Sequence, residues 1–283
     1  MSGTLYVVST PIGDPADLTI RAREVLSTVD RIAAEDTRVA LRLLRQLGVT
    51  PPVLVSYHDH NETDRAAELA GWLARGERIA VISDAGTPSI SDPGYRIVRA
   101  AVERGIPVVV VPGACAAVAA LSGSGLATDR FVFLGFLPRD EGPRAAALQA
   151  RRFETATLVL YEAPHRILDT LRAIGAAWGD RPAALARNLT KTYEQWHRGT
   201  VGAIAASLGE DETRGEMTLV VGGFDGRAEL EDHERVDRLI HGLVRAGVPV
   251  AVVRDVVAEV YDRPRREIYQ QALAARGDPE EAP

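Results

Sequence analysis

The feature that most constrains this chain is a regular alternation of short runs rich in valine and isoleucine with stretches of helical periodicity. Short apolar runs bounded by polar turns are typical of buried strands, and apolar residues recurring every three or four positions predict amphipathic helices. The alternation favours an α/β fold class, in which mostly parallel sheets carry helices on their faces. The predicted strands are Leu5–Ser9, Arg31–Ala34, Val53–Tyr57, Arg78–Ser83 and Val108–Val111 in a first set, and Phe131–Gly135, Thr157–Tyr161, Ala183–Arg187 and Met217–Val221 in a second. The helices predicted within the first set are Leu18–Thr28, Arg38–Leu47, Glu62–Arg75 and Tyr95–Arg104.

The two sets of strands are separated by turn-rich sequence at Ser122–Asp129, which predicts two α/β domains, 1–121 and 122–226. A charged segment, Gly226–Asp237, precedes helical periodicity that is broken near Pro249 and Pro264. We therefore expect residues 227–283 to form a linker and a small helical tail of three short helices. The tail is either a packing appendage or an RNA-binding element, and its nine basic against twelve acidic residues do not favour RNA.

Composition limits the kinds of partner. The net charge is −6, so a general nucleic-acid coat is excluded and any RNA contact has to be local. One cysteine, Cys115, permits no intrachain disulfide and fits a reducing compartment. The first residues do not resemble a secretion signal, and no apolar run approaches the roughly 20 residues that span a bilayer. We therefore expect a soluble, cytoplasmic protein without a membrane contact.

The segments after the strands of the first set are all polar or built from small residues. In a doubly wound sheet, ligands bind beyond the carboxyl ends of the strands, so five such segments at one edge predict a binding site. They contain neither a GxGxxG fingerprint nor a Walker loop, which argues against NAD and nucleoside triphosphates. The segments are Ser9–Thr19, Ala34–Arg38, Tyr57–Glu62, "SDAGTPSISDPG" at Ser83–Gly94, and Pro112–Ala117.

Two residue types in these segments invite a more reactive interpretation. His58 and His60 alternate, so they could face one side together, but no third metal ligand stands out. We favour a structural or substrate-contact role and expect no metal. Cys115 lies at a predicted helix start, where a thiolate can be stabilised, but without a nearby histidine it is better interpreted as a small residue beside a ligand.

The second set of strands also ends in polar segments, "GFLPR", "YEAPHR", "ARNLTKTYE" and "GEM". Between the first two lies Pro138–Arg152, with four arginines against two acidic residues. This segment is either a solvated helix face or a local patch for RNA phosphates.

Lys191 is the single lysine among 33 basic residues. One explanation is compositional drift. Another is that this position needs an amine that can lose its proton, which a guanidinium cannot do. A third is that Lys191 anchors a phosphate.

The motifs "TPIGDPADLTIRA", "AEDTR", "YHDHNE", "SDAGTPSISDPG", "GFLPR", "YEAPHR", "LTKTYE" and "GEMTLVV" occur here in the order of one family. Through them the chain resembles the ribosomal small-subunit RNA methyltransferase I branch of the tetrapyrrole methylase superfamily, over about Leu5 to Gly223. The resemblance implies the tetrapyrrole methylase fold, with S-adenosylmethionine in the cleft between the two α/β domains. It also implies a homodimer that methylates the ribose 2′-hydroxyl of a decoding-site cytidine in 16S ribosomal RNA, on the small ribosomal subunit or on free RNA, without a metal.

The resemblance also implies roles for individual residues. The implied cofactor-binding residues are Pro11, Ile12, Gly13, Asp84, Thr87, Cys115, Ala116, Glu162, Asn188 and Thr218. The residues expected to bind RNA are Arg38, His58, His60 and Arg166, together with Arg139, Arg144, Arg151 and Arg152 of the basic segment described above. Lys191 is the expected catalytic residue, with Glu194 and Asp36 as further candidates for the base. Asp92 is expected to cap the helix that follows, with Pro93 at its first position.

Two positions depart from the family pattern. The chain has "PGACA" at Pro112–Ala116 where the family usually has PGPSA, and Asn188 where a glutamate usually precedes LTK. Two other functions compete with RNA methylation. A tetrapyrrole-precursor C-methyltransferase would share the fold but would not need the "AEDTR" and "YHDHNE" motifs. A non-catalytic ribosome-binding module would not need the donor-site loops.

Overall fold

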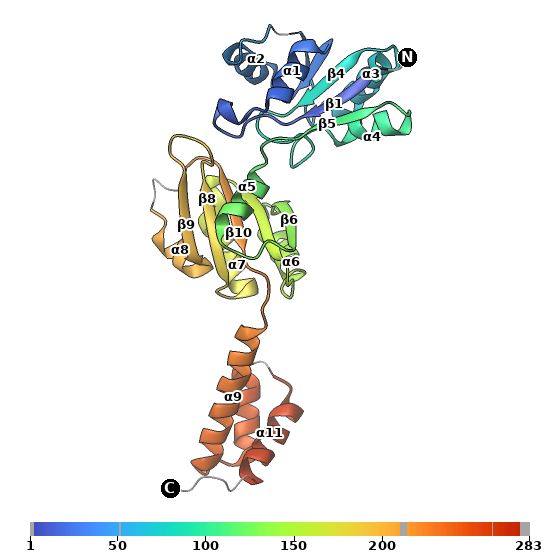
Figure 1. Ribbon diagram of the computed structural model, residues 1–283. Coiled ribbons are helices and arrows are strands. Elements are labelled where there is room, and N and C mark those ends of the chain that lie inside the picture. Colours follow the sequence, from blue (N-terminus) through green and yellow to red (C-terminus); the bar gives the residue numbers. More distant parts are fainter. Residues whose placement is uncertain (1–2, 51, 210–213, 262, 278–283) are drawn as a thin grey trace. The chain divides into compact units, whose positions relative to one another are not determined.

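The computed structural model describes residues 3–50, 52–209, 214–261 and 263–277. The chain divides into two compact units, one up to Phe224 and one from Asp225 onward. The first unit contains two sheets and the helices that cover them, and the second is helical (Figure 1).

The first sheet is built from β1 (Thr4–Val8), β2 (Arg31–Ala34), β3 (Val53–Ser56), β4 (Arg78–Ile82) and β5 (Val108–Val111). The strands lie in the order β3-β2-β4-β1-β5, and each neighbouring pair is parallel. The predicted strands of this set are confirmed, each within one residue at either end.

Helices cover both faces of this sheet because successive side chains of a strand point to opposite sides. Leu5 and Val7 of β1 pack in one core with helices α3 (Glu62–Ala74) and α4 (Tyr95–Glu103). Val8 packs on the other side in a core with α1 (Ile20–Thr28) and α2 (Thr37–Gln46). The short 3₁₀ turn η1 (Pro15–Asp17) precedes α1.

The second sheet is built from β6 (Phe131–Phe136), β7 (Thr157–Glu162), β8 (Pro182–Arg187), β9 (Gln195–Thr200) and β10 (Met217–Val221), in the order β6-β7-β10-β8-β9. β6 and β7 are parallel, whereas β10 is antiparallel to β7 and β8, and β9 is antiparallel to β8. β6, β7 and β8 therefore run in one direction and β9 and β10 in the other. The two-domain α/β class is confirmed, with a fully parallel first sheet and a mixed second sheet.

The helices of this domain also cover both faces of its sheet. α6 (Glu141–Gln149), α7 (Ile167–Trp178) and α8 (Val201–Ser207) pack with Leu219 and Val221 of β10. α5 (Ala116–Ser124) packs on the opposite face, against Val220. Residues 116–121, which the sequence assigned to the first domain, thus contact the second sheet. The 3₁₀ turn η2 (Pro164–Arg166) leads into α7.

The second unit contains α9 (Arg227–Arg245), α10 (Val250–Val260) and α11 (Arg265–Gly277). Val236, Ile240, Val253, Val257 and Ile268 form its core. The predicted helical tail is confirmed, but the predicted linker is wrong: the charged segment is already helical from Arg227. In the described part of the chain, no helix combines the length and the apolar character that a membrane span requires.

Candidate functional site

The loops after β1, β4 and β5 are bonded to one another at the carboxyl edge of the first sheet. The backbone N–H of Thr10 donates to the Gly86 carbonyl at 2.8 Å, and that of Gly86 donates to the Thr10 carbonyl at 3.2 Å. Gly86 has φ +84°, which favours glycine. The Thr87 hydroxyl donates to the Ala114 carbonyl and lies 2.9 Å from the Ser9 hydroxyl. These bonds hold the three loops as one wall.

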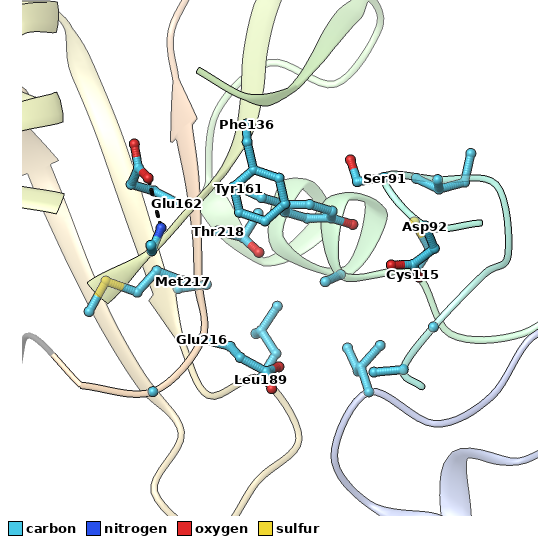
Figure 2. A pocket seen from close by; sticks show the side chains of 18 of the residues that line it. Ser91, Asp92, Cys115, Phe136, Tyr161, Glu162, Leu189, Glu216, Met217 and Thr218 are labelled. Carbon is cyan, nitrogen blue, oxygen red and sulfur yellow. Dashed lines mark hydrogen bonds between the residues drawn. The ribbon is translucent and has the colours of Figure 1, made fainter. Parts of the chain in front are cut away.

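This wall borders a cavity of about 390 Å³ whose other side comes from the second domain (Figure 2). The second domain contributes the ends of β6, β7, β8 and β10, together with Leu189 and Gly215–Thr218. The predicted cofactor-binding residues that line the cavity are Ile12, Thr87, Cys115, Ala116, Glu162 and Thr218. The predicted residues Pro11, Gly13, Asp84 and Asn188 lie outside this lining.

Gly13 lies where the two domains approach each other. A Cβ atom at this position would lie 2.6 Å from both Lys191 Cγ and Thr190 Oγ1. The next residue, Asp14, donates its backbone N–H to Thr190 Oγ1 at 3.0 Å. Gly13 therefore allows close packing of the β1 loop on residues 188–194, which we call the β8 loop.

The β8 loop is fixed by its own polar groups. Asn188 and Thr190 have positive φ angles of 54° and 61°, which L side chains rarely adopt. Asn188 exchanges hydrogen bonds with the backbone of Glu216, donating its N–H at 2.9 Å and accepting through Oδ1 at 3.2 Å. Glu194 accepts from the Thr190 N–H at 2.7 Å and from Trp196 Nε1 at 2.9 Å. These two bonds, chiefly the one from Thr190, hold the pKa of Glu194 below its ordinary value.

Of the predicted catalytic residues, Lys191 has the most direct connection to the cavity. Its Nζ lies 2.6 Å from Oε1 of Glu216, which lines the cavity. Both carboxylate oxygens of Glu194 accept bonds within and beside the β8 loop, as described above.

Asp36 is engaged elsewhere, at the start of α2. Its carboxylate caps the helix by accepting from the Arg38 N–H at 2.8 Å, and it pairs with the Arg38 guanidinium at 2.6 Å. The pairing with Arg38 holds the pKa of Asp36 well below its ordinary value. A carboxyl group with so low a pKa is a weak base.

Glu162 and Arg166 form a buried pair at the end of β7. Glu162 Oε2 accepts from the Thr170 hydroxyl at 2.5 Å, and its Oε1 accepts from the Ala163 N–H at 2.7 Å. Arg166 Nε lies 3.4 Å from Glu162, and its guanidinium donates to the Leu137 carbonyl at 3.0 Å. The Arg166 side chain is only 15% exposed and serves this internal network, and its contact with RNA stays a prediction.

The other residues predicted to bind RNA lie in two regions outside the cavity lining. In the first domain, Arg38 is exposed beside Asp36, and the His58 and His60 rings meet edge to face at 5.9 Å. The His58 N–H donates to Asn61 Oδ1, so this histidine belongs to the turn before α3. No three His, Cys, Asp or Glu side chains within the described ranges are grouped so that they could hold a metal ion.

In the second domain, the arginines lie before, on and after α6. Arg139, Arg151 and Arg152 are exposed, and Arg151 lies 3.9 Å from Glu154. Arg144 is half-buried and its guanidinium donates to the Arg139 carbonyl at 3.5 Å.

Asp92 is the main site residue that the sequence did not identify, and its expected role as a helix cap is wrong. α4 begins at Tyr95 after Gly94, which has φ +148°, so Pro93 is not its first residue either. Oε1 of the distant Glu62 accepts the N–H of Gly94 at 3.2 Å in place of a local cap. Asp92 instead lines the cavity, and the nearby Ser83 hydroxyl favours its charged form. Burial, followed by repulsion from Glu35, raises the pKa of Asp92 to about 6.

Asp84, the other aspartate of this loop, is exposed, and its Oδ1 accepts the Asp36 N–H at 3.0 Å. Two aromatic residues of the cavity were not among the predicted site residues, although they lie in the "GFLPR" and "YEAPHR" motifs. Tyr161 accepts the Ala117 N–H through its hydroxyl at 3.1 Å, and Phe136 is 55% exposed with its ring 5.7 Å from that of Tyr161.

The family model described as Tetrapyrrole (Corrin/Porphyrin) Methylases matches residues 4–205. The chain belongs to this family, which confirms the resemblance found in its motifs. It is 50% identical over 275 residues to Ribosomal RNA small subunit methyltransferase I of Micromonospora olivasterospora, covering 97% of this chain and 88% of that one. It is 46% identical over 278 residues to the protein of the same name from Escherichia coli O157:H7, covering 97% and 96%.

Among solved structures, uroporphyrin-III C-methyl transferase from Thermus thermophilus complexed with S-adenyl homocysteine is similar with a TM-score of 0.57. The two chains are 21% identical, and the match covers 78% of this chain and 97% of that one. At this identity the likeness supports the fold alone.

Proposed function

We propose that this chain transfers a methyl group from S-adenosylmethionine to the ribose 2′-hydroxyl of a decoding-site cytidine in 16S ribosomal RNA. The near full-length likeness to proteins named as small-subunit ribosomal RNA methyltransferases supports the class of substrate. The observation on the molecule itself that carries the proposal is the cavity shared by the two α/β domains.

The residues of this cavity suit the donor. Its volume of about 390 Å³ lies within the usual range of small-molecule sites. Ile12, Ile90 and Leu189 offer apolar contacts for a nucleoside, while Thr87 and Thr218 offer hydroxyl groups. The donor supplies a methyl group on a positively charged sulfur.

A ribose hydroxyl needs help to lose its proton, because it is a weak acid and a poor nucleophile. The Lys191–Glu216 pair is the polar group that we assign to this task, since Glu216 lines the cavity and Lys191 holds it at 2.6 Å. The β8 loop keeps the pair in place through the bonds of Asn188 and Glu194. The hydroxyl proton passes to this pair as the ribose oxygen bonds to the methyl carbon, the methyl–sulfur bond breaks and the donor leaves as S-adenosylhomocysteine.

RNA contacts are local in this proposal, because the chain as a whole is acidic. Arg139, Arg151 and Arg152 project from the α6 region and can hold phosphates without contributing to the cavity. A homodimer and a cytoplasmic location, both implied by the sequence resemblance, belong to the same proposal. Sedimentation of the purified chain tests the dimer.

The decisive experiment incubates the chain with methyl-labelled S-adenosylmethionine and small ribosomal subunits from cells that lack this modification. We expect label in the RNA, and nucleoside mass spectrometry should identify it as 2′-O-methylcytidine. Label on a base carbon, or transfer only to a tetrapyrrole precursor in a parallel reaction, would contradict the proposal. Subunit binding without any transfer would instead identify a non-catalytic binding module.

A further inference from the structure

Three carboxylates among the described residues line the cavity, and they differ in how their charge is balanced. Glu162 is buried against Arg166 and the Thr170 hydroxyl. Glu216 is paired with Lys191. Asp92 takes part in none of the ion pairs between described residues, and the group that most stabilises its charge, the Ser83 hydroxyl, is neutral.

The surroundings of Asp92 do not supply the missing positive charge. The ionisable groups with the largest effect on its pKa are acids from three loops: Glu35 after β2, Asp84 after β4, and Asp59 after β3. From the second-domain side, the hydroxyl of Tyr161 points toward Asp92 and Cys115 (Figure 2). Asp92 is thus a half-buried carboxylate among neutral and acidic groups, and its raised pKa reflects the cost of ionising it there.

A cationic ligand would remove this cost. S-adenosylmethionine has a permanent positive charge on sulfur, which S-adenosylhomocysteine lacks, while both carry the same ammonium and carboxylate groups. We propose that Asp92 is the counter-ion of the donor's sulfonium group and lets the cavity distinguish the charged donor from the product with its neutral sulfur. This inference rests on the proposed function, because it takes S-adenosylmethionine as the donor.

The proposal implies a direction of pH dependence. The charged form of Asp92 binds the sulfonium, so donor binding lowers the pKa of Asp92 from its ligand-free value of about 6. Donor affinity should be full above that value and should fall as the pH falls below it. Affinity for S-adenosylhomocysteine should change little over the same range, because its sulfur is uncharged.

Calorimetry with S-adenosylmethionine and S-adenosylhomocysteine as separate probes tests this between pH 5 and 7, where the amino group of both ligands stays protonated. We expect Asp92→Asn, which is nearly isosteric, to weaken the binding of S-adenosylmethionine by about ten- to a hundred-fold, the scale of one charge-assisted contact. S-adenosylhomocysteine should bind within about twofold of its wild-type affinity, and the pH dependence of donor binding should disappear.

Glu35→Gln is the matched control. Glu35 lies outside the cavity lining but repels Asp92, so its loss should move the midpoint of the pH dependence to lower pH and keep the preference for the donor. Thermal unfolding confirms that each variant is folded. In kinetic assays we expect Asp92→Asn to raise the KM for the donor more than it lowers kcat, since the contact between Asp92 and the sulfonium is made before the methyl moves.

Equal weakening of both probes by Asp92→Asn would overturn the inference, because it would mean a contact with the shared ammonium or a packing role. Unchanged donor affinity in a folded variant would overturn it as well. If the wild-type chain bound neither probe, the proposed function itself would fail, which separates the two hypotheses.

Discussion

The loops that bring Asp92 and Lys191 to the cavity are held in different ways. The β4 loop, residues 83–94, is fixed by backbone and hydroxyl bonds such as those of Gly86 and Thr87, and it leaves the Asp92 carboxylate without a cation. The β8 loop uses its charged side chains on itself or on its neighbours, with Glu194 bonded to Thr190 and Lys191 paired with Glu216.

Both loops nevertheless contain residues in backbone conformations that cost free energy. In the described part of the chain, the non-glycine residues with positive φ are Ser89 and Ser91 in the β4 loop and Asn188 and Thr190 in the β8 loop. Such conformations cost on the order of 1–3 kcal/mol each, and they persist where the surroundings impose them, often at functional sites. Under the proposed function, the two loops therefore have different roles. The β4 loop places the Asp92 carboxylate beside the ligand, and the β8 loop holds the proton-accepting Lys191–Glu216 pair in position.

The largest expected effect comes from removing the amine of the β8 loop. Lys191→Met should lower kcat for methyl transfer to small subunits by about 10²–10⁴, because the pair loses its role in proton transfer. Donor affinity measured by calorimetry should not weaken. Single-turnover assays of the variant check this, and nearly normal turnover would remove Lys191 from the chemistry.

Lys191→Arg then separates the two members of the pair. Arginine keeps the positive charge beside Glu216 but does not lose its proton at neutral pH. Retained turnover would identify Glu216 as the group that takes the proton, whereas a loss as large as that of Lys191→Met would identify Lys191.

The next effect concerns the packing of the β1 loop on the β8 loop. Gly13→Ala places a methyl group 2.6 Å from Thr190 Oγ1 and 2.8 Å from the Leu189 carbonyl, so the two loops have to move apart. We expect a loss of about 1–3 kcal/mol in the free energy of unfolding, as for other overpacked sites, together with weaker donor binding. Chemical denaturation and calorimetry measure both.

Gly71→Ala, in the interior of α3, is the control, since a Cβ there would meet only the end of the flexible Arg75 side chain, at 3.8 Å. Alanine is favoured over glycine inside a helix by about 0.5–1 kcal/mol, so this variant should be slightly stabilised. Equal stability of the two variants would mean that the loops are not tightly packed at Gly13.

A smaller effect is expected from the clamp inside the β8 loop. Glu194→Ala removes the acceptor for Thr190 and Trp196, which should cost about 1 kcal/mol at neutral pH because the site is exposed. The folded-state pKa of Glu194 is lowered, so its contribution is complete above the unfolded value near 4.3 and is lost as the pH falls through the folded value.

The stability difference between wild type and Glu194→Ala should therefore be present at pH 7 and shrink below about pH 4. Denaturation at both pH values measures it. Glu103→Ala, which removes an exposed partner of Arg99, is the comparison and should change stability by less than about 0.5 kcal/mol. A difference for Glu194→Ala that stays constant with pH would show that its carboxylate charge does not hold the loop.

The smallest effect lies outside both loops. Replacing Arg151 and Arg152 with glutamine should reduce the salt dependence of subunit binding by about one unit of slope per lost phosphate contact. Donor affinity should stay the same. Arg99→Gln, on the exposed surface of α4, is the control and should leave the salt dependence unchanged. If the Arg151/Arg152 variant showed the same salt slope as this control, the arginines around α6 would form only a solvated surface.

Much of the fold could be predicted because its strands are buried on both faces, so β1, β2, β4 and β10 appear in the sequence as near-continuous apolar runs. β9 was missed because Gln195–Thr200 is a polar edge strand with no fully buried residue, and neither composition nor alternation marks it. The start of α9 was missed for a similar reason, since a charged sequence was interpreted as exposed linker.

The site was predictable only where a motif places a residue at a strand end or in the loop that follows it, as for Glu162 and Thr87. The position of Asp92 depends on a contact across the fold: Glu62, thirty residues earlier, takes the N–H groups that a local cap of α4 would have taken. The residues around Asp92 in the sequence cannot reveal that a distant glutamate takes the place of the local cap. Glu194 and Asp36 are instead engaged by neighbours in the sequence, Glu194 by Thr190 and Trp196 and Asp36 by Arg38, and residue type alone does not show which side-chain oxygens accept these bonds.

The single lysine has a practical consequence for labelling chemistry. Because all other basic side chains apart from the histidines are arginines, an amine-reactive reagent has one side-chain target, Lys191, besides the terminal amine. The Lys191 side chain is 36% exposed, so the reagent can reach it, and its partner Glu216 lines the cavity. Acylation of that one peptide, followed by mass spectrometry, would therefore act as a footprint of cavity occupancy in whole protein without any engineered probe.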